Sequence, residues 1–248
     1  STGSLGAFSA RLTVFGLPFL FDSKEHMWSF LNSPYGQKML GDLASSRIVG
    51  LCWYDGGARS FYARVPLRTL DDLKGLRIRT QANPMIMDTV RALGADPVPV
   101  GIGQVIGMLE SGAIDGAENN PPSLLSLQHY RFARHYMLNN HMRLPEILIM
   151  SKVVWDRLTP AHQAAVRKAA ADSVAFQRAR WDAYEIEALN AVKADGVSVV
   201  EVKDYRPFRY AVRGLLAEAA TQFPDTLKAI SAARNLRWVV EPGQINVP

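Results

Sequence analysis

Residues 161–194 read AHQAAVRKAAADSVAFQRARWDAYEIEALNAVKA, and this stretch decides the fold. It contains neither proline nor glycine and is rich in residues that favour helices. Thr159 and Pro160 precede it as a predicted helix start, and Gly196 closes it. A helix of roughly 34 residues is about 50 Å long, whereas a small domain is about 30 Å across. The sequence therefore predicts two lobes tied together by one long helix.

The rest of the chain alternates short apolar runs with helical segments, and turn residues separate them. This alternation is typical of α/β layers. Further amphipathic helices are predicted up to residue 233, and the tail 242–248 is predicted to be extended. The other predicted helices are 22–31, 34–45, a short one at 69–75, 83–94 and 103–111, and the predicted strands are 48–54, 77–81, 97–100 and 197–202.

Composition narrows the function classes. The chain has 248 residues, 48% of them hydrophobic, and a formal net charge of +5. Lysine and arginine are scattered without a run of five, so we expect no nucleic-acid binding. Neither a membrane-spanning run nor a signal peptide is visible, so an exported protein would already have lost its signal. The single cysteine, Cys52, lies in an apolar run and is predicted to be buried.

Patterns that resemble catalytic or cofactor motifs are weak. Gly101, Gly103 and Gly107 follow an extended run, but their spacing is one residue too long for a dinucleotide fingerprint. A turn that presents N–H groups to a pocket is the better interpretation. The five histidines include no i, i+4 pair, and the chain has no nucleophile elbow, P-loop or C-x-x-C motif. We therefore expect no metal, no cofactor and no enzymatic activity.

Two groups of polar residues remain as site candidates. Arg77 and Arg79 share one face of a predicted strand, and apolar Ile78 lies on the other. An arginine in a covered sheet must be paired or face a cleft, and the pattern favours a salt bridge and a ligand clamp equally. Arg59 follows another buried strand. The polar segment 115–121 is either a turn or a loop that lines a site.

Six motifs, in this order and spacing, make the chain resemble the solute-binding proteins of tripartite ATP-independent periplasmic (TRAP) transporters, C4-dicarboxylate type. The resemblance extends along nearly all of the chain. It rests on residues 16–21 (GLPFLF), 55–59 (DGGAR), 69–79 (TLDDLKGLRIR), 92–99 (ALGADPVP), 112–119 (GAIDGAEN) and 158–160 (LTP).

The resemblance implies an α/β, two-lobed Venus-flytrap fold with a long helix under both lobes. About seventy residues that normally precede the Leu-Pro-Phe motif are absent, so the N-terminal part of lobe 1 is expected to be missing. The implied boundaries are 1–54 for lobe 1 and 55–145 for lobe 2. Residues 146–184 return to lobe 1 and include the first half of the spanning helix, and residues 185–248 form the second half of lobe 2 and the C-terminal helices.

The resemblance also implies a ligand site. Arg79 is expected to clamp a carboxylate, because a guanidinium offers a planar fork and stays charged when desolvated. Arg59 and Asn119 match other pocket positions, and Ile102 matches a position that packs on the ligand. The asparagine can donate and accept hydrogen bonds. The full set of expected ligand-binding residues is Arg79, Arg59, Asn119, Gln81, Ile102, Glu118 and Asn120.

The implied role is periplasmic capture of a small organic acid anion for the TRAP membrane subunits. Gln81 and the Asn119-Asn120 pair would suit the hydroxyls of a sugar acid such as a uronate. An aromatic or hydroxy monocarboxylate and a C4-dicarboxylate remain alternatives. A sensor module and an enzyme on a similar scaffold are the rival function classes.

Overall fold

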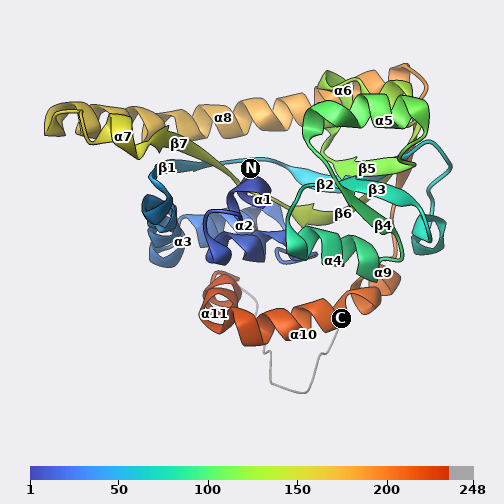
Figure 1. The fold of residues 1–248 in the computed structure, drawn as a ribbon, viewed down its shortest axis with the longest axis horizontal. Coiled ribbons are helices and arrows are strands. Elements are labelled where there is room, and N and C mark those ends of the chain that lie inside the picture. Colours follow the sequence, from blue (N-terminus) through green and yellow to red (C-terminus); the bar gives the residue numbers. More distant parts are fainter. Residues whose placement is uncertain (235–248) are drawn as a thin grey trace.

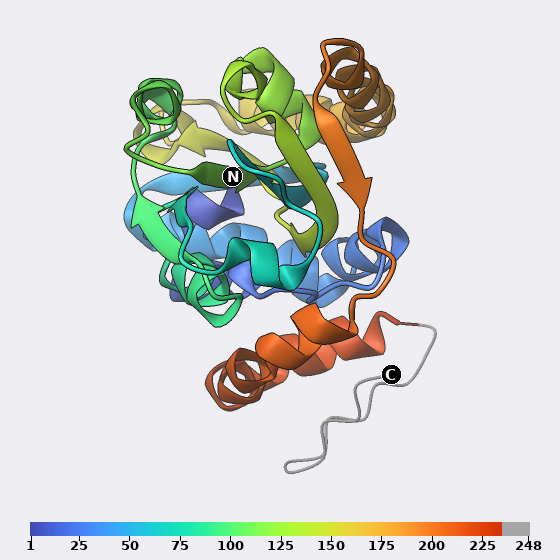
Figure 2. The ribbon, with the colours of Figure 1, turned by 90° about the vertical axis from the view of Figure 1, so that its right-hand side faces the viewer.

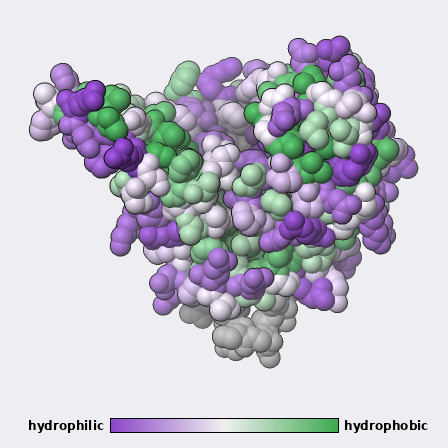
Figure 3. Space-filling model, in the orientation of Figure 1, coloured by the Kyte–Doolittle hydropathy of each residue, from purple (hydrophilic) through white to green (hydrophobic). Residues whose placement is uncertain are grey.

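The computed structural model describes residues 1–234, and the predicted extended tail lies outside this range. Its longest element is helix α8, Pro160–Ala194, as the sequence predicts (Figure 1). The Thr159 side chain caps it by accepting a hydrogen bond from the His162 N–H, at 3.3 Å. The start of α8 projects as an arm, and polar and apolar side chains mix on it (Figure 3). Within residues 1–234 we find no helix that is long and apolar enough to cross a bilayer.

The larger sheet has six strands in the order β4-β3-β5-β2-β6-β8. Strand β3 runs parallel to β4 and β5, β2 runs antiparallel to β5 and β6, and β8 runs parallel to β6. Helices cover both of its faces (Figure 2). The strands are β2 Ala58–Ala63, β3 Arg77–Thr80, β4 Asp96–Pro99, β5 Gly116–Asn119, β6 His135–Arg143 and β8 Ser198–Glu201.

The smaller sheet pairs β1, Ile48–Tyr54, with β7, Glu146–Ser151, in antiparallel fashion. The chain crosses between the sheets twice, at residues 55–57 and 144–145. The first crossing is fixed to α8, because Gln177 accepts from the Asp55 N–H and donates to the Asp55 carbonyl, both at 2.9 Å. Gly57 in this crossing has φ +69°, a conformation that favours glycine. Helix α8 thus holds the segment that links the two sheets.

Short helices surround the smaller sheet, and all of them except the one at residues 152–155 share one apolar cluster with it. The helix predicted for 34–45 is two elements, α3 and the 3₁₀ helix η2. Gly36 and Gly41 lie in this stretch and lower its helix propensity. The elements are α1 Thr2–Leu5, η1 Ala10–Gly16, α2 Lys24–Leu31, α3 Pro34–Met39, η2 Leu40–Ser46 and α7 Lys152–Trp155.

Two separate apolar clusters lie on the faces of the larger sheet. One is closed by α4 and α9, and the other by α5, α6 and the end of α8. The helix predicted from 103 starts as a 3₁₀ turn, η4, before α5. The remaining elements are η3 Leu70–Leu73, α4 Pro84–Ala92, η4 Ile102–Gln104, α5 Val105–Ser111, α6 Pro121–Ser126, η5 His129–Arg131, α9 Arg206–Ala211, α10 Arg213–Gln222 and α11 Pro224–Ala232.

Helices α10 and α11 return to the N-terminal part of the chain. Ala219, Phe223 and Ile230 belong to the cluster around the smaller sheet, and the carbonyl of Ile230 lies 2.9 Å from the His26 ring. The implied boundaries stay a prediction. No local pattern states which cluster an amphipathic helix will join, so the sequence does not specify this contact of the C-terminal helices.

Candidate ligand-binding site

A row of side chains crosses the larger sheet and places Arg79 on one face. Tyr136 pairs with Tyr62, Tyr62 with Ala117, and Ala117 with Arg79. Paired residues on adjacent strands project to the same side of a sheet. Register therefore gathers residues that lie far apart in sequence, from β6, β2, β5 and β3.

Arg59 is buried and neutralised inside the protein. Its Nε donates to Glu118 Oε2 at 2.5 Å, and its Nη2 donates to Glu118 Oε1 at 2.8 Å and to the Glu118 carbonyl at 2.6 Å. Its Nη1 donates to Asn119 Oδ1 at 2.8 Å. All three guanidinium nitrogens thus have protein partners. The fork geometry predicted for a ligand carboxylate is used here on the protein's own carboxylate.

Glu118 stays ionised because of these contacts. Burial alone would raise its pKa, but the charge and hydrogen bonds of Arg59, together with the nearby His141, lower the pKa of Glu118 to about 2. His141 Nε2 lies 3.7 Å from Glu118 Oε2, and its Nδ1 lies 3.0 Å from Asn139 Oδ1. Burial lowers the pKa of His141 itself. The buried charges of Arg59 and Glu118 therefore cancel each other.

Arg79 differs from Arg59 although both are buried. Its side chain is 4% exposed, and its Nε donates to the Val100 carbonyl at 2.9 Å. Its two Nη atoms make no hydrogen bond to any of residues 1–234, and neither of them is completely shielded from solvent. Burial lowers the pKa of Arg79, and the charge of Glu118 partly opposes this effect. A buried cation without an ion-pair partner is suited to bind an anion.

Arg77, on the same strand, forms an exposed salt bridge. Its Nη2 lies 2.8 Å from Asp115 Oδ1. Of the two interpretations that the strand pattern left open, the salt bridge holds for Arg77. The role of Arg79 as a ligand clamp stays a prediction.

The two asparagines after Glu118 also differ. Asn119 Oδ1 accepts from Arg59 and from the Asn120 N–H, whereas its Nδ2 has no hydrogen-bond partner among residues 1–234. Asn120 uses both ends within the protein: Nδ2 donates to the Gly56 carbonyl at 2.8 Å, and Oδ1 accepts from the Ser123 N–H at 2.9 Å as the cap of α6. Asn119 therefore keeps a donor for a ligand, and Asn120 supports the crossing segment.

The last two predicted residues lie near the ends of β3 and β4. Gln81 follows β3 and accepts from the Ser4 hydroxyl of α1 at 3.0 Å. Ile102 is 42% exposed and begins η4, two residues after the carbonyl that holds Arg79. The N–H of Gly101 donates to Gln104 Oε1 at 3.1 Å, so this amide is not available to a ligand, contrary to the expectation for the glycine turn.

Tyr62, Tyr136, His129 and His141 lie around these residues, and the sequence analysis did not select them. Tyr136 Oη donates to the Asn119 carbonyl at 3.0 Å, and Tyr62 Oη lies 2.8 Å from His129 Nδ1. The spacing of the histidines bears only on metal binding. Their contacts depend on strand register, which a search for short motifs does not consider.

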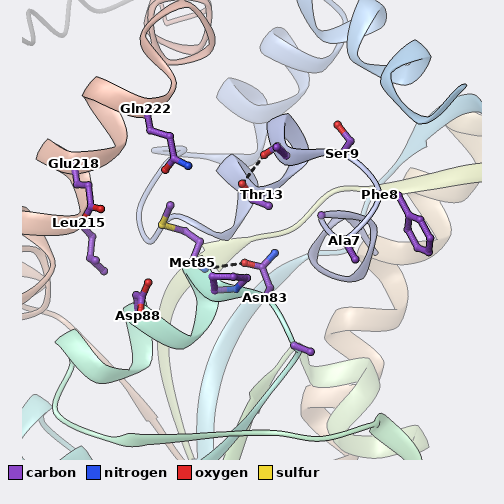
Figure 4. Close-up of a pocket in the computed structure, with 14 residues that line it drawn as sticks. Ala7, Phe8, Ser9, Thr13, Asn83, Met85, Asp88, Leu215, Glu218 and Gln222 are labelled. Carbon is purple, nitrogen blue, oxygen red and sulfur yellow. Dashed lines mark hydrogen bonds between the residues drawn. The ribbon is translucent and has the colours of Figure 1, made fainter. Parts of the chain in front are cut away.

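A separate cavity of about 630 Å³ lies between α1, η1, α4 and α10 (Figure 4). None of the seven predicted site residues lines it. Its ionisable lining residues are Asp88 and Glu218, which would repel a carboxylate. This cavity therefore does not coincide with the expected ligand site around Arg79, which stays a prediction. Within residues 1–234, no group of three or more His, Cys, Asp or Glu side chains is arranged to hold a metal ion.

Comparison with known proteins gives a consistent result. Residues 1–222 match the family model of bacterial extracellular solute-binding protein, family 7. A solute-binding protein of Chromohalobacter salexigens is 32% identical over 224 residues, which are 90% of this chain and 67% of that protein. The chain spans about two thirds of the length of the first curated relatives that it matches.

Two solved structures have the same fold. A TRAP periplasmic solute-binding protein of Xanthobacter autotrophicus, with bound β-D-galacturonate, matches with a TM-score of 0.89 and 44% identity, over 94% of this chain and 78% of that one. One from Pseudomonas putida, with bound D-glucuronate, matches with a TM-score of 0.90 and 36% identity, over 98% and 79%. The predicted family and α/β binding-protein fold are confirmed. The chain belongs to bacterial extracellular solute-binding protein family 7, the non-enzymatic periplasmic binding proteins of TRAP transporters.

Proposed function

We propose that this protein captures a sugar-acid monocarboxylate, such as a uronate, in the periplasm for the membrane subunits of a TRAP transporter. The observation that carries the proposal is the buried Arg79, whose two Nη atoms have no partner among residues 1–234. A ligand carboxylate can accept both free N–H groups at once. Such a contact would also compensate the buried charge.

The charges favour one carboxylate over two. Arg59 is already neutralised by Glu118, so Arg79 is the one predicted arginine with free nitrogens in the described chain. The second carboxylate of a C4-dicarboxylate would approach ionised Glu118 without a free cation to balance it. This distinction supports a monocarboxylate over the C4-dicarboxylate alternative.

The other predicted residues suit a ligand with hydroxyl groups. The free Nδ2 of Asn119 can donate to a hydroxyl oxygen, and the Gln81 amide can do the same. The exposed side chain of Ile102 offers an apolar surface to a sugar ring. The related structures that contain galacturonate and glucuronate support the same ligand class.

No bond of the ligand needs to form or break. Ligand contacts would stabilise the closed arrangement of the two lobes, by no more than the difference in affinity between closed and open states. Two hydrogen bonds join α1 to the segment after β3: Ser4 Oγ to Gln81 Oε1 at 3.0 Å, and Asn83 Nδ2 to the Gly3 carbonyl at 3.0 Å. We assign these contacts to the closed state.

A thermal-shift panel tests the ligand class. Ligand at 100 times its dissociation constant adds ~2.7 kcal/mol, which corresponds to a Tm increase of about 5–10 °C for a chain of this size. We expect that increase with glucuronate, galacturonate or an aldonate, and less than about 1 °C with succinate or malate at equal concentration. Glucose, which lacks the carboxylate, is the control. A response to succinate alone would contradict the proposal, and a response to lactate or an aromatic acid alone would favour the other monocarboxylates.

A further inference from the structure

Tyr62 and His129 form a buried polar pair that has no role in the site described so far. Tyr62 Oη lies 2.8 Å from His129 Nδ1, and both residues are buried. Tyr62 comes from β2, and His129 begins η5. A buried hydroxyl and imidazole could be replaced by apolar side chains without leaving unpaired groups. Their presence therefore invites a functional explanation.

Strand register places this pair beside Arg79. Tyr62 and Arg79 both flank Ala117, on opposite sides, in one row across the sheet. Adjacent strands are about 4.8 Å apart, so the two backbones are separated by about 10 Å, which two long side chains can bridge. The charge of Arg79 also acts on both members of the pair.

The pair is uncharged at neutral pH. Burial raises the pKa of the Tyr62 phenol, and burial together with the charge of Arg79 lowers the pKa of His129 to about 4. The side chains of Tyr62 and His129 are therefore polar but uncharged, and register places Tyr62 on the face of the sheet that carries Arg79. Arg59 shows what the alternative does, because a carboxylate within reach of its guanidinium occupies the nitrogens that a ligand would need.

We propose that Tyr62 and His129 are positioning residues: they form a polar wall on the face of the sheet that carries Arg79, and this wall leaves the guanidinium free for a ligand carboxylate. This inference rests on the proposed function, since it assumes that Arg79 binds the ligand. Neither residue needs to touch the ligand. Their effect on affinity should pass through Arg79, and this property separates positioning from general support of the fold.

The test is a double-mutant cycle with glucuronate, measured by isothermal titration calorimetry. Tyr62→Phe removes the hydroxyl and keeps the ring. We expect it to weaken binding about tenfold in the parent protein, but at most about twofold in an Arg79→Lys background, because coupled residues give non-additive effects. Tyr54→Phe is the matched control. It removes a hydroxyl that lies 2.6 Å from Ser173 Oγ, away from Arg79, and it should leave affinity within about twofold of the parent.

A second pair of variants tests neutrality directly. His129→Gln keeps an uncharged group that can hydrogen-bond to Tyr62, and we expect affinity within about threefold of the parent. His129→Glu places a carboxylate next to Arg79, and we expect affinity to fall at least about fiftyfold while the protein remains folded. Thermal unfolding of each variant verifies that the protein under test is folded.

The inference would be overturned if Tyr62→Phe weakened glucuronate binding equally in the parent and in the Arg79→Lys background. It would also be overturned if Tyr62→Phe, or folded His129→Glu, bound glucuronate as tightly as the parent. The proposed function fails in a different way. If the parent binds no sugar acid, or if Arg79→Lys binds glucuronate as tightly as the parent, then Arg79 is not the clamp. If His129→Glu does not fold, the double-mutant cycle with Tyr62→Phe still tests the inference.

Discussion

The two buried arginines, Arg59 on β2 and Arg79 on β3, present the same chemical group in opposite states. Arg59 is held by both oxygens of Glu118, by a carbonyl and by Asn119. Within residues 1–234, Arg79 has one hydrogen bond, from Nε to the Val100 carbonyl. The first arginine belongs to the framework of the sheet, and the Nη atoms of the second have no partner among residues 1–234. Burial alone therefore does not distinguish the two arginines; the number of unused donors does.

The largest expected difference between the two arginines is in stability without ligand. Arg59→Ala should lower the free energy of unfolding by about 3–5 kcal/mol, since it leaves the charge of Glu118 buried without a partner. Arg79→Ala should leave stability unchanged or raise it, because it removes a buried charge that lacks an ion-pair partner. Urea denaturation of both variants measures this contrast. Equal destabilisation by the two substitutions would contradict the view that Arg59 has a charge partner and Arg79 has none.

The lowered pKa of Glu118 predicts that the folded protein loses stability at acid pH. The folded pKa of Glu118 is about 2, below its ordinary value of 4.5. The stabilisation from its ionised form is complete above pH 4.5 and is lost as the pH falls towards 2, up to about 3 kcal/mol. The stability difference between parent and Glu118→Gln should therefore be greatest at neutral pH and should shrink below pH 4.5. A difference that does not change between pH 7 and pH 3 would contradict the lowered pKa.

Ligand affinity, in contrast to stability without ligand, should depend strongly on Arg79. We expect Arg79→Ala to weaken glucuronate binding at least a hundredfold, a loss of about 2.7 kcal/mol or more. Arg77→Ala is the matched control, since it removes an arginine from the same strand that is already paired with Asp115. Its affinity should stay within about threefold of the parent. Calorimetric titration of both proteins tests the pair, and similar losses would place the clamp elsewhere.

The smallest of these effects is the loss of ligand affinity expected from substitution of Asn119. Asn119→Ala removes the free Nδ2 donor and one acceptor of Arg59, so binding should weaken by about 1–3 kcal/mol. Asn120→Ala provides the comparison: it removes the cap of α6 and should lower Tm more than affinity. If Asn120→Ala lost more affinity than Asn119→Ala, the ligand would contact the second asparagine instead.

Much of the local structure follows from sequence. The helix α8, the strand β3 and the start of α4 at Asn83-Pro84 occur where the pattern predicts them. Each depends on residues that are neighbours in the chain, such as a cap, an apolar period or a closing glycine. The break at Leu40 and the 3₁₀ turn before α5 were not predicted, because short helices depend on packing more than on propensity.

The candidate site, like the fold, has a part that follows from sequence and a part that depends on tertiary structure. The sequence by itself determined that Arg59, Arg79 and Asn119 are polar residues within or next to buried strands, and the family resemblance assigned them to a pocket. Only the tertiary structure decided that Glu118 neutralises Arg59, that Asn120 caps a helix, and that Tyr62 and His129 lie beside Arg79. The physical reason is that hydrogen bonds and charge pairs act over a few ångströms, and strand register brings together residues that are 20 to 80 positions apart in the chain.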